Sequence, residues 1–133
     1  MANNRILIVD DDPDVVEAMK LTLETGGYEV FEASNGREGL QKVKELSPDL
    51  LILDVMMDSD TEGFQVSYAL RTPDPEYAAY VNLPILMVTA IGKAKGMQFS
   101  PETDGNYLPV DDLVEKPIQP AVLLEKVKML IEK

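Results

Sequence analysis

Acidic residues follow two apolar runs of the sequence at the points where each run ends. The stretch ILIVDDDPD places Asp10, Asp11 and Asp12 directly after residues 6–9, and LLILD ends in Asp54. Carboxylates are ligands for hard cations, and Mg²⁺ in particular binds through a few carboxylates while keeping several waters. If these acids come together, the sequence predicts a magnesium site.

A hydroxyl and an ammonium group stand at the ends of two later apolar runs. Thr89 ends ILMVT, and Lys116 follows LVE. A threonine hydroxyl can donate to a phosphoryl oxygen, and lysine provides a compact positive charge beside phosphate. Acids, cation, hydroxyl and ammonium together are typical of phosphoryl transfer.

Apolar runs and helical spacings predict the elements that carry these residues. Expected strands are Arg5–Val9, Glu29–Ala33, Leu50–Asp54, Ile85–Thr89 and Leu113–Glu115. Expected helices begin after the N-cap Asp12 and Pro13, run near Asn35 to Leu46, lie around Phe64 to Leu70, and begin at Pro120. Residues 91–107 have poor helical periodicity, so a fourth helix there is expected to be short or shifted.

Strands that alternate with helices indicate parallel βαβ units with right-handed crossovers, hence an α/β sandwich with helices on both faces. We expect one domain over residues 1–133, with about five helices. Ligands of such sheets lie at the carboxyl ends of the strands. If the strand order is 2-1-3-4-5, Asp10 and Asp11 lie close to Asp54. Three carboxylates in one pocket repel one another unless a cation joins them.

Composition excludes several classes of function. The 133 residues include 24 acidic and 12 basic side chains, a net charge of -12, which disfavours direct contact with nucleic acid or anionic membranes. Cysteine and histidine are absent, so disulfides, thiol nucleophiles and the usual zinc sites are excluded. Neither a membrane span nor a secretion signal is evident, and we expect a cytoplasmic protein.

Four short motifs resemble those of one protein family. VDD at residues 9–11, ILD at 52–54, VTA at 88–90 and EKP at 115–117 occur in order, each at a strand end. Together they resemble the receiver domain of bacterial two-component response regulators, over essentially the whole chain. The resemblance implies a flavodoxin-like three-layer α/β/α sandwich with a five-stranded parallel sheet of order 2-1-3-4-5.

The resemblance also implies roles for the acids. Asp54 would accept a phosphoryl group from a phosphohistidine on a partner protein. Asp10 and Asp11 would hold Mg²⁺ together with Asp54 and the backbone carbonyl of Met56. Since the chain has no histidine, the phosphodonor must be a partner, either a sensor histidine kinase or a histidine phosphotransfer protein.

Thr89 and Lys116 would contact the phosphoryl oxygens and help to switch a surface that a downstream protein reads. Such a domain is not an enzyme in the usual sense, because it shows at most weak self-catalysed phosphorylation and dephosphorylation. We expect a monomer or weak dimer. Two positions depart from the family pattern: Leu113 replaces a usual aromatic, and Asp58 stands where a proline is common.

Two alternative functions remain open from the sequence. Asp10 and Asp12 also fit the DxD pattern of a magnesium-dependent phosphatase of the haloacid dehalogenase kind, although Asp54 would then be unexplained. The other alternative is a pseudo-receiver, a binding module that keeps the fold but is never phosphorylated. The complete set of acids, Thr89 and Lys116 argues against it.

Overall fold

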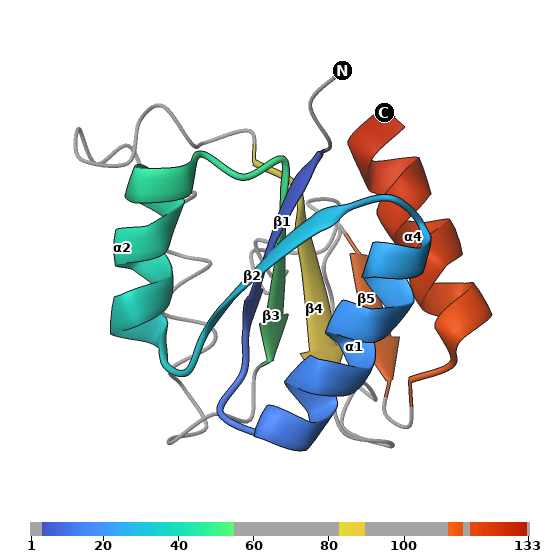
Figure 1. The fold of residues 1–133 in the computed structure, drawn as a ribbon, viewed down its shortest axis with the longest axis horizontal. Helices are drawn as coiled ribbons and strands as arrows, with labels where there is room; N and C mark the ends of the chain where they lie inside the picture. The colour runs from blue at the N-terminus through green and yellow to red at the C-terminus, as the bar shows by residue number, and fades with distance from the viewer. Residues whose placement is uncertain (1–3, 55–82, 90–111, 116–117, 133) are drawn as a thin grey trace, which may run out of the picture.

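A single parallel sheet forms the centre of the molecule (Figure 1). The structure is a computed structural model that describes residues 4–54, 83–89, 112–115 and 118–132, except for the side chains of Thr89, Leu113 and Glu115. Its strands are β1 (Arg5–Val9), β2 (Glu29–Ala33), β3 (Leu50–Asp54), β4 (Ile85–Thr89) and β5 (Asp112–Glu115). They pair in the order β2-β1-β3-β4-β5, which confirms the predicted topology.

Helices cover both faces of this sheet. The described helices are α1 (Pro13–Thr25), α2 (Gly36–Leu46) and α4 (Pro120–Glu132). All three were predicted, as was each strand, and only β5 begins one residue earlier than expected. The helix expected around Phe64 to Leu70 and the one expected within residues 91–107 lie outside the described residues.

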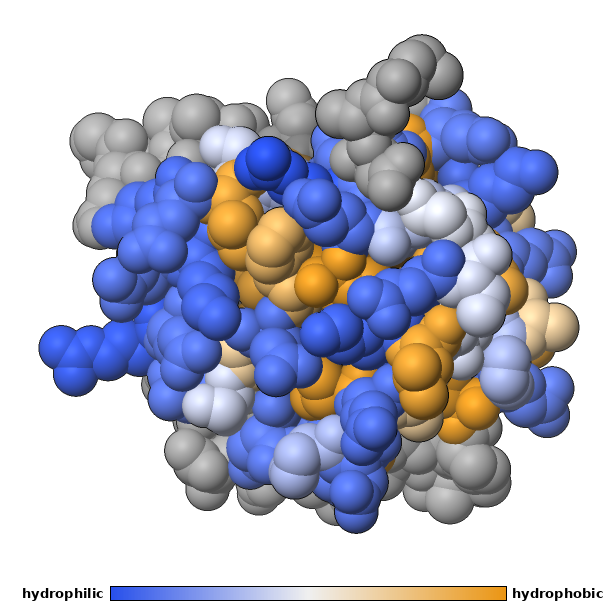
Figure 2. Space-filling view, in the orientation of Figure 1, coloured by the Kyte–Doolittle hydropathy of each residue, from blue (hydrophilic) through white to orange (hydrophobic). Residues whose placement is uncertain are grey.

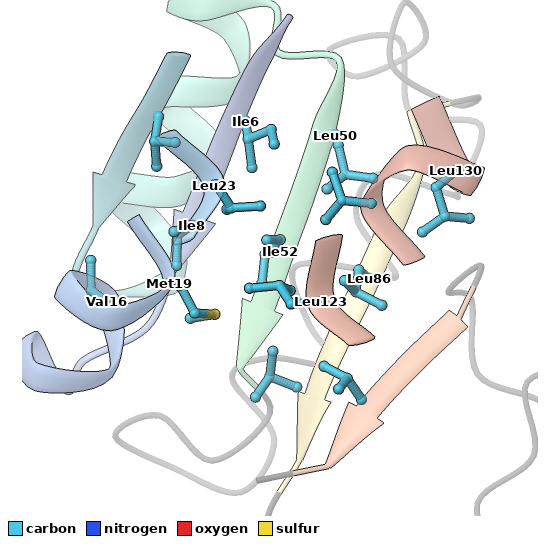
Figure 3. Packing of buried hydrophobic residues seen from close by; sticks show 14 residues of the cluster. Ile6, Ile8, Val16, Met19, Leu23, Leu50, Ile52, Leu86, Leu123 and Leu130 are labelled. Carbon is cyan, nitrogen blue, oxygen red and sulfur yellow. The ribbon is translucent and has the colours of Figure 1, made fainter. Parts of the chain in front are cut away.

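Strand side chains alternate between two hydrophobic layers, because successive residues of a strand point to opposite faces. Ile6 and Ile8 of β1 pack with α1 and α4 on one face, whereas Leu7 and Val9 pack with α2 on the other. Figure 3 shows the first layer, in which the helices contribute one stripe each: Val16, Met19 and Leu23 from α1, and Leu123, Val127 and Leu130 from α4. Central strands buried on both faces explain the unbroken apolar runs in the sequence.

Helix α1 begins and ends where the sequence predicts. The side chain of Asp12 accepts hydrogen bonds from the backbone N–H groups of Asp14 and Val15, and Pro13 occupies the first helical position. After Thr25 the chain turns through Gly26, and Gly27 takes a φ of 89°, which glycine adopts without strain. These boundaries fix which residues of α1 face the sheet.

Helix α2 packs unusually close to the sheet. Its N-cap is Asn35, whose side chain accepts from Glu38 N at 2.8 Å. A Cβ atom on Gly39 would lie 2.7 Å from Cγ2 of Val9, so only glycine allows this approach. The helix ends at Ser47, which adopts a left-handed conformation with φ 47° and ψ 61°.

Hydrophilic side chains predominate on the face shown in Figure 2, with apolar side chains visible between them. Among the described residues, no helix has the length and apolar character needed to cross a membrane.

Candidate functional site

The register of β1 and β3 brings acids from both strands to one edge of the sheet. Ile8 pairs with Ile52, and Val9 pairs with Leu53. Extending this register by one residue sets Asp10 beside Asp54. Because Ile8 and Ile52 point to the same face, their neighbours two positions further on share that face as well.

Asp10, Asp11 and Asp54 form the acidic cluster of this edge. One carboxylate oxygen from each residue lies within 4.8 Å of the other two. Asp10 and Asp54 are each only 2% exposed, whereas Asp11 is exposed. Two buried carboxylates and one accessible carboxylate therefore converge on one point.

Asp10 is held on two sides by backbone groups. Its N–H donates to the carbonyl of Ala33 at 3.1 Å, which joins it to the end of β2. Its Oδ1 accepts a hydrogen bond from the backbone N–H of Asp12 at 2.9 Å, and its Oδ2 is buried. These bonds fix the carboxylate where β1 gives way to α1.

The other predicted site residues are described only in part. Val88 pairs with Asp54, so the backbone of Thr89 follows at the same edge of the sheet. Thr89 in turn pairs with Glu115, the residue before Lys116. Lys116 itself, Met56 and the side chain of Thr89 lie outside the described part of the chain.

An open cleft of about 890 Å³ leads to the acidic cluster. Asp10 and Asp11 line one end of it, and residues of α1, β2 and α2 line the rest, among them Lys20 and Lys42. The exposed Asp11 is therefore accessible from solvent along this side.

The donor set of the cluster fits a hard divalent cation. All three groups offer carboxylate oxygens, which Mg²⁺ and Ca²⁺ prefer, and no nitrogen or sulfur ligand is among them. Burying a carboxylate is costly without compensation, and two of these three carboxylates are buried. A cation bound here would offset their mutual repulsion.

Comparison with known proteins identifies the family. The sequence model for the response regulator receiver domain matches residues 6–128. This chain is a response regulator receiver domain. Relatives of this receiver domain include the transcriptional regulator RpaA of Synechocystis, 33% identical over 97% of the chain, and PhoP of Bacillus subtilis, 35% identical over 98%.

The receiver domain spans about half the length of these curated relatives, 49% of RpaA and 50% of PhoP. RpaA is described as a DNA-binding dual master transcriptional regulator, and PhoP as a regulator of alkaline phosphatase synthesis. The comparisons give no support to the haloacid dehalogenase or pseudo-receiver alternatives.

Solved structures agree with this assignment over nearly the whole receiver domain. A response regulator from Chloroflexus aurantiacus superposes with a TM-score of 0.81 at 33% identity, covering 99% of this chain and 100% of that one. TrrA from Thermotoga maritima, solved in complex with Mg²⁺-BeF, gives a TM-score of 0.76 at 32% identity and covers 96% and 98%. Both likenesses confirm the predicted receiver fold.

Sequence reasoning missed one residue at the site of this receiver domain. The sequence predicts Asp12 as a helix cap, or as part of a phosphatase DxD pattern, but neither prediction includes the hydrogen bond from its backbone N–H to Asp10. A signal was available, because aspartate side chains often accept from the N–H group two residues further on. The DxD spacing of Asp10 and Asp12 suits such a turn.

Proposed function

We propose that Asp54 is the phosphoacceptor of this receiver domain. The observation that carries the proposal is the convergence of buried Asp54 with Asp10 and Asp11 at the carboxyl edge of β1 and β3, with oxygens within 4.8 Å of one another. Asp10, Asp11, Asp54 and the backbone carbonyl of Met56 would hold Mg²⁺. The ion would neutralise charge on the phosphoryl oxygens.

The proposed transfer exchanges one bond to phosphorus for another. A carboxylate oxygen of Asp54 forms a bond to phosphorus while the bond to the imidazole nitrogen of a partner's phosphohistidine breaks, and the electron pair stays on the imidazole. Thr89 and Lys116 are proposed to contact the phosphoryl oxygens. The backbone placement supports these roles, since Thr89 pairs with Glu115, the residue before Lys116, at the same edge of the sheet.

The proposed partners are proteins. A sensor histidine kinase or histidine phosphotransfer protein would supply the phosphoryl group, because this chain contains no histidine. A downstream protein would read the phosphorylated state. The net charge of -12 disfavours direct contact between this domain and DNA. Self-catalysed phosphorylation and dephosphorylation would be weak.

Intact-mass measurement after incubation with acetyl phosphate tests the proposal. With Mg²⁺ present, we expect the native chain to gain the mass of one phosphoryl group, and Asp54→Asn to gain none. Phosphoryl uptake should fall steeply when Mg²⁺ is left out, and also in Asp11→Asn, which removes a proposed Mg²⁺ ligand. In both cases no cation balances the negative charge of the incoming phosphoryl group.

Asp14→Asn is the matched control, since Asp14 is an exposed acid near the same edge but outside the acidic cluster. It should take up phosphate as the native chain does. Labelling of Asp54→Asn to the native extent would contradict the assignment, and sustained release of phosphate from small phosphoesters would favour a phosphatase instead.

A further inference from the structure

Asp12 connects the acidic cluster to helix α1 through hydrogen bonds on both of its sides. Its Oδ1 accepts from Asp14 N at 3.0 Å and from Val15 N at 3.5 Å, and its carbonyl accepts from Val16 N at 3.1 Å. In the other direction, its N–H donates to Oδ1 of Asp10 at 2.9 Å. The first turn of α1 and the carboxylate of Asp10 are thus both hydrogen-bonded to the same residue, Asp12.

The bond to Asp10 determines how that carboxylate can lie. Asp10 is buried, and its backbone is already held by the carbonyl of Ala33. A hydrogen bond to one carboxylate oxygen restricts the rotation of the group and thereby the directions in which its other lone pairs point. The cap holds Asp12 in an extended conformation, with φ -98° and ψ 105°, at the residue whose N–H bonds Asp10.

We propose that Asp12 is a positioning residue for the metal site: by capping α1, it holds its own backbone N–H against Asp10 and so orients a proposed cation ligand. This inference rests on the function proposed above. Asp12 lies outside the acidic cluster, so it acts through Asp10. Partners of metal ligands commonly tune affinity in this way.

Capping and charge can be separated by substitution. The cap needs a side-chain oxygen that accepts from the helix N–H groups, and asparagine provides one as well as aspartate does, whereas alanine provides none. Asp12→Asn therefore keeps the cap and removes the charge, while Asp12→Ala removes both. Asp14→Asn is the matched control for charge, because it removes an exposed acid two residues further on and leaves the cap acceptor in place.

Affinity for Mg²⁺ can be measured from stability against urea at increasing concentrations of MgCl₂, with each variant referred to its own metal-free value. We expect Asp12→Asn and Asp14→Asn to match the native chain, and Asp12→Ala to bind Mg²⁺ about tenfold more weakly. Because each variant is compared with its own stability in the absence of Mg²⁺, a loss of helix stability is not counted as a loss of Mg²⁺ affinity. Asp12→Gly, which costs less helix stability than alanine, gives the same test if Asp12→Ala fails to fold.

Native affinity in Asp12→Ala or Asp12→Gly would overturn the positioning role. Equal weakening of Asp12→Asn and Asp12→Ala, with Asp14→Asn unchanged, would also overturn it, because the charge of Asp12 and not its cap would then matter. If MgCl₂ leaves the stability of the native chain unchanged, the proposed magnesium site itself fails, which is a separate result.

Discussion

Gly39 lies where helix α2 comes closest to strand β1. The space for a side chain at this position is already filled by Val9, whose Cγ2 would lie 2.7 Å from an added Cβ. Val9 directly precedes Asp10, so the close approach of α2 occurs beside the acidic cluster. A single missing methyl group therefore sets how tightly one helix covers the strand that presents Asp10.

Gly39→Ala should lower the free energy of unfolding by about 1 kcal/mol. Overpacking a core destabilises a protein by about 1–3 kcal/mol. The better helix propensity of alanine offsets roughly 0.5–1 kcal/mol of this loss. Urea unfolding of both proteins measures the difference.

Val9→Ala provides the control, since it removes the two methyl groups that the new Cβ would meet. In the double variant, Gly39→Ala should cost less than it does alone. If Gly39→Ala alone is as stable as the native protein, α2 can move away from β1 without loss of stability.

Ser47 ends α2 in a conformation that a serine seldom adopts. Its φ of 47° is the only positive value at a non-glycine residue in the described ranges. Its N–H still donates to the carbonyl of Val43 at 3.0 Å, so the left-handed turn satisfies one of the last carbonyls of the helix.

Ser47→Gly should raise the free energy of unfolding by about 0.5–1 kcal/mol. A left-handed residue other than glycine costs roughly 1–2 kcal/mol, which exceeds the roughly 0.5–1 kcal/mol of entropy that glycine loses on folding. Thermal or urea unfolding tests this, with Ser47→Ala as a control that should bring no gain. Equal stability of the glycine and alanine variants would argue against strain at this turn.

At the scale of elements, most of the described fold could be predicted because local signals and tertiary packing agree. Each strand is an apolar run that the sheet buries, and Asp12 with Pro13 marks the start of α1 by capping chemistry alone. The acidic cluster follows from strand order, since neighbouring parallel strands end at one edge.

The features that could not be predicted depend on distances between elements. The contact of Gly39 with Val9 requires the depth at which α2 packs, which periodicity does not contain. The ion pair of Lys126 with Asp112, at 3.1 Å from both carboxylate oxygens, joins α4 to β5 and requires their relative position. Side-chain spacing along one element gives neither.

Across the whole molecule, the charge of Glu132 in the last turn of α4 acts on Tyr28, the residue before β2. Burial of the Tyr28 side chain raises its pKa above the ordinary value of 10.0, and the negative charge of Glu132 raises it further. The folded state therefore keeps the phenolic proton at pH values where the unfolded chain has lost it.

Stability should consequently fall as pH rises above 10.0 towards the higher pKa of Tyr28 in the folded state. The contribution is fully present below the unfolded pKa. Urea unfolding of the native chain and of Tyr28→Phe across this range measures it, because the titration of other groups is common to both proteins. As pH rises, the free energy of unfolding of the native chain should fall relative to that of Tyr28→Phe.

Glu132→Gln provides the control, since it removes the charge but keeps the burial. It should reduce the pH dependence without abolishing it. A constant difference between the native chain and Tyr28→Phe throughout this range would mean that the phenol titrates alike in both states.

The influence of Glu132 on Tyr28 also indicates where α4 ends. Tyr28 immediately precedes β2, so Glu132 lies at the edge where the strands begin, while Asp10, Asp11 and Asp54 lie at the edge where they end (Figure 1). In a longer chain, any unit fused behind α4 would start at the pole opposite the acids. Such a unit would sense the proposed phosphorylation of Asp54 only through the body of the domain, and its attachment there would leave the acidic cluster accessible to the proposed phosphodonor.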